Sequence, residues 1–270
     1  MSASRLAVWG DPIAHSKSPQ LHAAAYQVLG LGWQYTRRRV DAEGFAEALD
    51  GLDDSWCGLS LTMPLKEQAF RASTTLDRHA RLTGAVNTLL LSDGRRGFNT
   101  DVGGIVDALA AEGIDAAARV RILGAGATAA SALVASVELG AESIEVRARR
   151  PERAAGLVAL GEQLDVDVTA TSFDAALEPV DLTIATLPSG TVLDHGLAAR
   201  MSGSGGVLFD VAYSPWPSTL ATAWVDGRAL SGEGMLLRQA VRQIRIFAHG
   251  DQSVPLPSEA AVVAAMKAVL

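Results

Sequence analysis

The stretch VRILGAGATA, residues 120–129, decides how the second half of this chain folds. A short apolar strand, residues 120–123, runs into the pattern Gly124-x-Gly126-x-x-Ala129, which opens a helical pattern ending near Leu139. A strand, a glycine turn and a helix in this order are the context in which such a motif binds a dinucleotide. Gly124 permits the tight turn, Gly126 lets a pyrophosphate approach the backbone, and the small Ala129 allows close helix packing. An ordinary strand-to-helix turn is the alternative interpretation.

The predicted phosphate-binding loop leads into a helix N-terminus, where free backbone amides and a partial positive charge attract phosphate. Thr128 can add a hydroxyl contact to the turn. We therefore expect the whole loop to bind a cofactor. It consists of Gly124, Ala125, Gly126, Ala127, Thr128 and Ala129.

Apolar strands alternate with amphipathic helices on both sides of this loop, which predicts an α/β fold with largely parallel sheets. Strands are expected at 6–9, 34–40, 58–61, 120–123, 143–147, 168–171, 182–185, 207–211 and 228–230. Helices are expected at 21–29, 44–49, 65–72, 101–112, 151–164, 235–247 and 258–269. Segments 87–91 and 95–98 form an expected hairpin, because Asp93-Gly94 favours a tight turn.

The composition excludes several classes of protein. The 270 residues carry a formal net charge of −7 with both signs interspersed, and no Lys/Arg stripe indicates nucleic-acid binding. The single cysteine, Cys57, cannot form an intrachain disulfide, and no His/Cys/Asp/Glu cluster has the spacing of metal ligands. No apolar run has the length of a membrane span. We therefore expect a cytoplasmic protein without a metal, a nucleic-acid partner or a membrane partner.

Polar motifs occupy four places in the first hundred residues and one near the end. They are GDPIAHSKSP (10–19), GLSLTMPLK (58–66), GAVNT (84–88), GFNTD (97–101) and GMLLRQ (234–239). Ser16 and Ser18 place two hydroxyls in a turn before a helix, a pair that suits a polyhydroxylated or carboxylated small molecule. Ser18 followed by Pro19 also fits an N-cap with proline at the first helical position.

Together with the phosphate-binding loop, these motifs closely resemble, in order and over nearly the whole chain, the signature of the shikimate/quinate dehydrogenase family. The resemblance implies an N-terminal α/β substrate-binding domain (1–103), a Rossmann-type NADP-binding domain (104–234) and C-terminal helices (235–270) that return to the first domain. No proline- or serine-rich linker separates the halves, so the boundary is expected within or beside the helix that begins at Asp101.

The resemblance also implies the reacting groups. Lys66 and Asp101 match the family's catalytic pair, and the chemistry needs a proton donor beside a ketone that receives hydride. Pro64 suits the first helical turn, which places Lys66 near a helix N-terminus, where the dipole disfavours its ammonium. A solvated helix lysine and an N-cap aspartate are the ordinary alternatives.

The substrate implied by the resemblance carries a ring carboxylate and ring hydroxyls. Its implied ligands are Ser16, Ser18 and Tyr213 for the carboxylate, Asn87, Asp101 and Gln239 for the hydroxyls, and Thr62 lining the pocket. Taken singly, Asn87 could be a turn residue, Gln239 a solvent-facing helix residue and Tyr213 an anchored strand end. His15 and His22 are expected to belong to the scaffold rather than to the catalytic set.

The end of strand 143–147 selects the nicotinamide cofactor. An NAD enzyme usually has an acidic residue there for the ribose, whereas an NADP enzyme has arginine for the 2′-phosphate. The family's arginine falls on Arg149, and Arg150 adds a second guanidinium, which favours a dianionic phosphate. Glu145 lies too far back in the strand to hold the ribose. NADP is therefore expected, and an exposed basic helix start is the alternative.

Three positions depart from the family pattern, namely Ser60, Ala148 and Ala185, where relatives usually carry asparagine. The change at Ser60 leaves room for a rearranged structural hydrogen bond, and the change at Ala185 removes an amide that could contact the cofactor. Neither removes a catalytic group. Gly234 and Met235, in the last motif, are expected beside the nicotinamide.

The activity implied by the resemblance is the NADPH-dependent reduction of 3-dehydroshikimate to shikimate by a monomer or homodimer. One alternative is a catabolic quinate/shikimate dehydrogenase that uses NAD, which would favour an acidic residue after Val146 and often a threonine in place of Ser18. The other is a non-catalytic dinucleotide-binding regulator, which should have lost Lys66 or Asp101.

Overall fold

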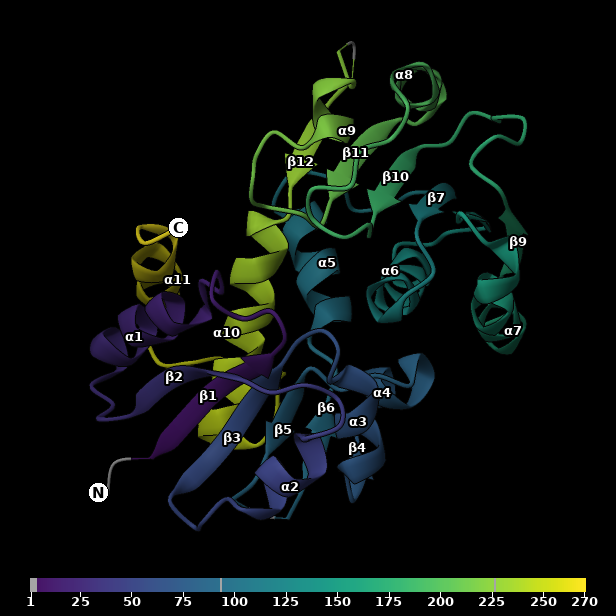
Figure 1. The fold of residues 1–270 in the computed structure, drawn as a ribbon. Coiled ribbons are helices and arrows are strands. Elements are labelled where there is room, and N and C mark those ends of the chain that lie inside the picture. Colours follow the sequence, from purple (N-terminus) through teal and green to yellow (C-terminus); the bar gives the residue numbers. More distant parts are fainter. Residues whose placement is uncertain (1–3, 93, 226) are drawn as a thin grey trace. The chain divides into compact units, whose positions relative to one another are not determined.

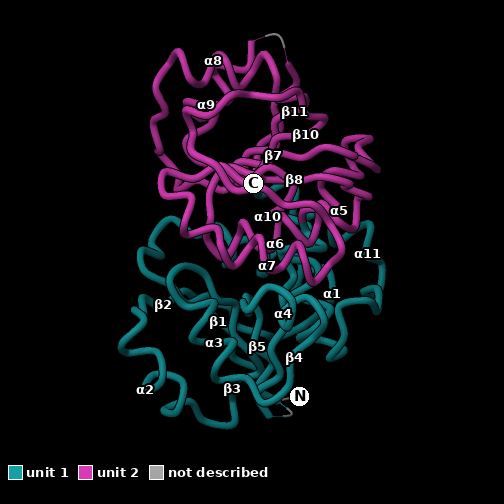
Figure 2. The backbone as a smooth tube through the Cα atoms, turned by 90° about the vertical axis from the view of Figure 1, so that its right-hand side faces the viewer, with its two compact units in different colours: residues 1–104, 237–270 teal, residues 105–236 magenta. Residues whose placement is uncertain are grey.

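The computed structural model of the chain describes residues 4–92, 94–225 and 227–270. It divides into two compact units: unit 1 comprises Met1–Gly104 and Leu237–Leu270, and unit 2 comprises Ile105–Leu236 (Figure 2). Each unit contains one six-stranded sheet. Asp93 of the expected hairpin turn and residues 1–3 of the expected first domain lie outside the described residues.

Unit 1 is built on a mixed sheet with the strand order β2-β1-β3-β5-β6-β4. Strand β1 is parallel to β2 and β3, whereas β5 is antiparallel to both of its neighbours. The strands are β1 (Arg5–Gly10), β2 (Gln34–Arg39), β3 (Trp56–Leu61), β4 (Thr75–Leu76), β5 (Thr88–Leu90) and β6 (Arg96–Phe98). The first helices are α1 (Ser18–Leu29), α2 (Phe45–Asp50), α3 (Lys66–Ala72), α4 (Arg78–Thr83) and α5 (Asp101–Ala110).

Alternate side chains of the central strands enter two different layers of unit 1, as the two-residue period of a strand requires. Ala7, Trp9, Leu59 and Leu61 belong to one buried cluster with apolar side chains of α2 and α3. On the opposite face, a Cβ added to Gly58 would lie 2.5 Å from the ring of Phe247. A C-terminal helix therefore packs directly on the backbone of β3, where only glycine fits.

The C-terminal helices α10 (Glu233–His249) and α11 (Glu259–Lys267) return to unit 1, as expected from the sequence (Figure 1). Arg245 and Glu259 form an ion pair that joins α10 to α11. Helix α11 lies beside α1 (Figure 1), and Gln20 Nε2 of α1 donates a hydrogen bond of 2.7 Å to the Val269 carbonyl. Unit 1 is thus closed by residues from both ends of the described chain.

Unit 2 has an entirely parallel sheet with the order β12-β11-β10-β7-β8-β9. This is the doubly wound order of dinucleotide-binding folds, with its switch point between β7 and β10. The strands are β7 (Arg119–Leu123), β8 (Ser143–Arg147), β9 (Asp167–Thr171), β10 (Leu182–Ala185), β11 (Val207–Asp210) and β12 (Ala229–Ser231). The helices are α6 (Ala127–Glu138), η1 (Pro151–Ala154), α7 (Ala155–Gln163), α8 (His195–Ser204) and α9 (Thr219–Thr222).

The structure adds four elements that the sequence pattern does not predict, namely β4, α4, α8 and α9. The three helices begin at side chains that cap them: Asp77 accepts from Ala80 N, Asp194 from Leu197 N and Ser218 from Ala221 N. A capping hydrogen bond stabilises a helix that is short or whose residues have weak helix propensity. The helix expected at 151–164 is in fact a 3₁₀ turn, η1, followed by α7.

Candidate active site

The polar motifs of unit 1 meet at one edge of its sheet. Because β5 is antiparallel to β3 and β6, its beginning lies at the same edge as the ends of β1, β3 and β6. Asn87 stands just before β5, Thr62 follows β3, and Asp101 begins α5 soon after β6. A Cβ on Gly10, at the end of β1, would lie 2.4 Å from Thr62 Cγ2. The segments after β1 and β3 therefore touch.

Lys66 and Asp101 form a largely buried ion pair. Lys66 Nζ lies 2.6 Å from Asp101 Oδ2, and the two side chains are 14% and 7% exposed. Lys66 is therefore not a solvated helix lysine. An ammonium has three hydrogens, and only one is needed for Asp101. The other hydrogens of the Lys66 ammonium are available to donate to a substrate oxygen at this edge of the sheet.

The expectation that Pro64 lies in the first turn of the lysine helix is wrong. Helix α3 begins at Lys66, with Leu65 as its N-cap. The Leu65 amide donates to the Thr62 carbonyl over 2.8 Å, which closes a turn around Pro64. Lys66 is nevertheless at the helix N-terminus, where the dipole acts against its charge and makes the Asp101 carboxylate the more necessary.

Asn87 fixes the orientation of the Asp101 carboxylate. Asn87 is 2% exposed, and its Nδ2 donates to Asp101 Oδ1 over 2.7 Å and to Thr100 Oγ1 over 2.9 Å. Its Oδ1 accepts from Thr100 N and Thr88 Oγ1, each over 2.9 Å. Both amide hydrogens are thus used within the protein. A ring hydroxyl would have to displace Thr100 or Asp101 to accept from Asn87.

Ser16 and Ser18 lie in the serine loop, which we define as residues 11–18. Ser18 is buried and is the first residue of α1, and its amide donates to Ser16 Oγ over 3.3 Å. The N-cap of α1 is Lys17, without a capping side chain, so the alternative in which Ser18 caps the helix is wrong. The Ser16 oxygen accepts from the first amide of α1, but its hydroxyl hydrogen and the Ser18 hydroxyl are not needed by the helix terminus and can serve other partners.

Two arginines of β2 hold the serine loop in place. Arg39 donates two hydrogen bonds, of 2.8 and 3.1 Å, to the carboxylate of Asp11. Arg37 donates to the Ala14 carbonyl. Arg37 and Arg39 are therefore local supports for the loop that precedes α1, whereas the Arg38 guanidinium lies over the ring of Trp9.

Gln239 lies on α10 where this helix crosses α5. A Cβ on Gly104 would be 2.8 Å from Gln239 Cβ, and a Cβ on Gly103 would be 2.4 Å from the Arg242 guanidinium. Two consecutive glycines thus let α10 approach the helix that starts with Asp101. Gln239 is 8% exposed, so it is not the solvent-facing residue of the alternative interpretation.

Gln243 belongs to the same site, although the sequence interpretation did not include it. Its Oε1 accepts from Ser60 Oγ over 2.8 Å, and its Nε2 donates to the Asn87 carbonyl over 3.3 Å. It follows Gln239 by one helical turn on a largely buried helix. In the sequence, two glutamines four residues apart on the apolar face of an amphipathic helix indicate a buried polar site. Ser60, whose change was expected to leave room for a rearranged hydrogen bond, is used for this contact.

The phosphate-binding loop of unit 2 has the geometry of its motif. Gly124 has φ +114°, and a Cβ there would lie 2.6 Å from Thr186 Oγ1. Gly126 is the N-cap of α6, and a Cβ there would meet no protein atom within 4 Å. The packing of the protein would therefore tolerate a side chain at position 126. A pyrophosphate that approaches the backbone would not, which explains the glycine. Ala129 is fully buried. These residues fit a dinucleotide.

The end of β8 offers two arginines and no carboxylate. Arg149 and Arg150 are exposed. Glu145 Oε2 accepts from Arg121 over 2.6 Å, and its Oε1 from Arg147 over 2.5 Å. Burial raises the pKa of Glu145, but the hydrogen bonds from Arg147 and Arg121 outweigh it and hold the pKa below its usual value. Both carboxylate oxygens of Glu145 are therefore occupied by arginines of unit 2 and do not bind a ribose. The two exposed arginines at the end of β8 fit a 2′-phosphate better than a free ribose diol.

The remaining expected site residues lie in unit 2 or outside the polar edge. Gly234 and Met235 stand in the first turn of α10, with Met235 buried. Tyr213 is half-buried in the segment after β11. Its help to the serines of unit 1 stays a prediction. His15 is exposed, and burial lowers the pKa of His22 to about 3, so His22 is neutral at physiological pH.

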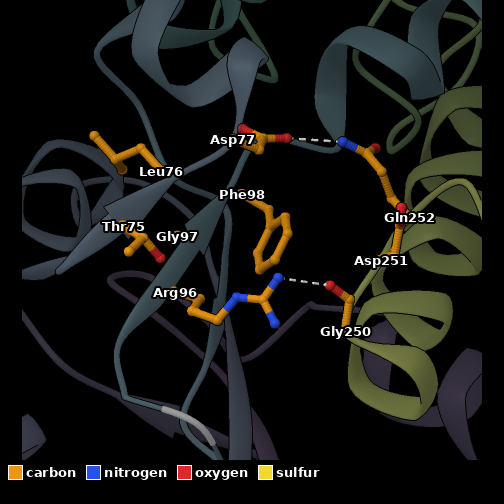
Figure 3. Close-up of a pocket in the computed structure, with 9 residues that line it drawn as sticks. All are labelled: Thr75, Leu76, Asp77, Arg96, Gly97, Phe98, Gly250, Asp251 and Gln252. Atoms are coloured by element: carbon orange, nitrogen blue, oxygen red, sulfur yellow. Dashed lines mark hydrogen bonds between the residues drawn. The ribbon is translucent and has the colours of Figure 1, made fainter.

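A separate pocket of about 380 Å³ lies in unit 1 between β4, β6 and the segment after α10 (Figure 3). Its polar groups are paired: Gln252 Nε2 donates to Asp77 Oδ2 over 2.7 Å, and Arg96 donates to the Gly250 carbonyl over 2.9 Å. None of the predicted site residues lines it. These contacts join the segment after α10 to β6 and to the residue after β4, which gives the pocket a structural role.

Within the described residues, no three His, Cys, Asp or Glu side chains are grouped as metal ligands. No helix in the same part of the chain is both long and apolar enough to cross a bilayer.

Comparison with known proteins gives a consistent result for both halves. Residues 8–89 match the family model of the shikimate dehydrogenase substrate binding domain. The shikimate dehydrogenase (NADP(+)) of Xanthomonas euvesicatoria is 35% identical, over 93% of this chain and 92% of that protein. The crystal structure of Mycobacterium tuberculosis shikimate dehydrogenase has 38% identity and a TM-score of 0.83, covering 98% of this chain and 99% of that one. A Thermus thermophilus shikimate 5-dehydrogenase in complex with NADP(H) and shikimate has 29% identity and a TM-score of 0.81, over 99% and 100%. The chain therefore belongs to the shikimate dehydrogenase family.

Proposed function

We propose that this chain catalyses the reversible reduction of 3-dehydroshikimate to shikimate with NADPH, a step toward chorismate and the aromatic amino acids. The observation that carries the proposal is the buried Lys66–Asp101 pair, 2.6 Å apart and oriented by Asn87. A regulator that only binds dinucleotide has no need of a largely buried ammonium. We place the enzyme in the cytoplasm as a monomer or homodimer that acts on small molecules.

The chemistry assigned to the pair follows from its charges. The nicotinamide, when bound, supplies the hydride that adds to the ketone carbon. The ketone oxygen then becomes an alkoxide, which needs a proton. The Lys66 ammonium donates this proton, and Asp101 holds the ammonium before the step and aims it. In the reverse direction, neutral Lys66 takes the proton from the shikimate hydroxyl.

Substrate binding is assigned to hydroxyls and amides around this pair. Ser16 and Ser18 hold the ring carboxylate, while Gln239 and Asp101 bind ring hydroxyls and Thr62 lines the pocket. Neutral serines suit the task, because an added cation would bind substrate and transition state alike and would mainly lower KM.

Replacing Ser16 and Ser18 together by alanine should raise KM for shikimate at least tenfold and leave KM for NADP unchanged. A hydrogen bond to a charged group contributes about 1.5–3 kcal/mol, so the loss of two should be evident. Initial rates give both constants. Ser73→Ala is the matched control, because the Ser73 hydroxyl only donates to the Ala69 carbonyl of its own helix. Equal weakening of shikimate and NADP would contradict the assignment and indicate a folding defect.

Replacing Arg149 and Arg150 together by alanine should raise KM for NADP at least tenfold, which corresponds to about 1.4 kcal/mol of lost binding. KM for NAD should change far less, because NAD lacks the 2′-phosphate. Arg153→Ala, at another exposed arginine of the same segment, is the control. If the unaltered enzyme already preferred NAD, the arginines would have been misassigned.

Initial rates with shikimate and quinate, each with NADP and NAD, test the function as a whole. The proposed enzyme should be fastest with shikimate and NADP. A quinate/shikimate dehydrogenase working with NAD should prefer the opposite cofactor, and a binding protein should show no turnover with any pair. Family membership and the commitment of Glu145 to two arginines argue for the first result.

A further inference from the structure

A buried polar cluster lies on the face of the unit 1 sheet that α10 covers. It consists of His22, Tyr26, Tyr35, Ser60 and Gln243. In the parallel register, Tyr35 is the partner of Leu6, and Ser60 is the partner of Val8. Leu6 and Val8 are two residues apart, so the side chains of Tyr35 and Ser60 emerge on one face, on either side of β1.

The hydroxyl of Tyr35 is the unusual member of this cluster. It is buried, and among the residues that the structure describes it has no hydrogen-bond partner of ordinary geometry. Its ring stacks on His22, with centroids 3.8 Å apart and planes at 17°, which restricts its movement. Burial raises the pKa of Tyr35 well above its usual value, and the hydroxyls of Ser60 and Ser18 act on it in the opposite direction. The phenol therefore stays protonated. Ser18 and His22 are both buried and lie four residues apart on α1, so Ser18 is on the face of this helix that carries the imidazole stacked on Tyr35.

The two serines differ in whether another group already fixes their single hydroxyl hydrogen. Ser60 has one hydroxyl hydrogen, and this hydrogen is directed to Gln243 Oε1 over 2.8 Å. The same glutamine donates to the Asn87 carbonyl, so the Ser60 hydroxyl is already fixed. Ser18 also has one hydroxyl hydrogen, and it can hold a carboxylate only by donating it. The Ser18 oxygen is then free to accept, and the Tyr35 O–H is an unassigned donor beside it.

We propose that Tyr35 is a positioning residue for the substrate carboxylate: its hydroxyl donates to Ser18 Oγ and thereby directs the single Ser18 hydrogen toward the carboxylate. Tyr35 does not touch the substrate in this arrangement. His22 holds the phenol ring in place and adds no charge. The inference rests on the proposed function, because it takes Ser18 to be a carboxylate ligand.

Tyr35→Phe removes the hydroxyl and keeps the ring that stacks on His22. We expect KM for shikimate to rise about three- to tenfold, the effect of one ordinary hydrogen bond. The value of kcat should stay within about twofold, and KM for NADP should not change. Tyr26→Phe is the matched control, since the Tyr26 hydroxyl pairs with His22 Nδ1 at 2.9 Å. An equal rise of KM in both variants would overturn the inference, because it would reflect a loosened cluster.

A double-mutant cycle distinguishes action through Ser18 from a general effect. Ser18→Ala/Tyr35→Phe should have the same KM for shikimate as Ser18→Ala alone, whereas Ser16→Ala/Tyr35→Phe should show both losses. The methyl ester of shikimate, which lacks the negative charge, should show a smaller difference between the unaltered enzyme and Tyr35→Phe.

The outcomes separate this inference from the proposed function. Additive losses in the Ser18 cycle, or an unchanged KM in Tyr35→Phe, would overturn the role of Tyr35 while shikimate oxidation by the unaltered enzyme stands. If the unaltered enzyme fails to oxidise shikimate, the proposed function itself is wrong.

Discussion

Replacing Lys66 by alanine should lower kcat for shikimate oxidation by about two to four orders of magnitude, the usual contribution of a group that transfers a proton. KM for shikimate should change little, because the interaction gains its strength in the transition state. The buried Lys66–Asp101 pair gives the reason: without the ammonium, the alkoxide oxygen has no cation beside it, and Asp101 is left as an uncompensated buried carboxylate. Steady-state rates with NADP check this result.

Lys267→Ala is the control for this variant, because Lys267 is an exposed lysine of α11 in the same unit. It should retain full kcat. Thermal unfolding and NADP binding of the Lys66 variant should show that the protein remains folded. A Lys66→Ala enzyme that keeps most of its kcat would exclude Lys66 as the proton donor.

Removing residues 234–270 should abolish shikimate binding and destabilise unit 1, with residual NADP binding by unit 2. The deletion takes away Gln239 and Gln243, and it uncovers the face of the sheet against which Phe247 packs at Gly58. It also removes the crossing of α10 over Gly104. Calorimetric titration with shikimate and with NADP, together with urea unfolding, measures the three effects.

A point variant gives a milder version of the same experiment. Ile244→Ala creates a cavity in α10 and should cost about 2–5 kcal/mol of unfolding free energy, as for other buried isoleucines. Met201→Ala in α8 is its counterpart in unit 2. The first should weaken shikimate binding and the second should not. Tight shikimate binding by the truncated protein would show that the C-terminal helices are not part of the substrate site.

The sequence predicts best those elements that have a strong local pattern. The strands Ser143–Arg147 and Leu182–Ala185 have the predicted bounds, because apolar residues at alternate positions, such as Ile144 with Val146 and Leu182 with Ile184, indicate a strand. Helix α8 was missed for the opposite reason. Its sequence, HGLAARMSGS, has weak helix propensity, and the helix depends on the Asp194 cap and on the packing of its apolar side chains near Trp224.

The residues of the candidate site likewise differ in whether a local sequence pattern predicts them. The motifs indicated Lys66, Asp101 and Asn87 as members of one site, and the structure places them in direct contact. The contact between Ser60 and Gln243 spans 183 residues and leaves no trace in local periodicity. The stacking of Tyr35 on His22 likewise depends on how α1 packs against β2, which neither segment reveals by itself.

The division of unit 1 into two separate stretches of sequence has a consequence for the order of folding during synthesis. Residues 105–236 are contiguous, so unit 2 has all of its strands as soon as they leave the ribosome. Unit 1 is complete only after residues 237–270 have been synthesised, since the layer that covers Gly58 and Ser60 follows unit 2 in the sequence. Until then, one face of the unit 1 sheet is exposed to water and the polar edge of this sheet is incomplete. The nascent chain therefore acquires its cofactor-binding half first, and the helices that follow unit 2 in the sequence complete the substrate-binding half.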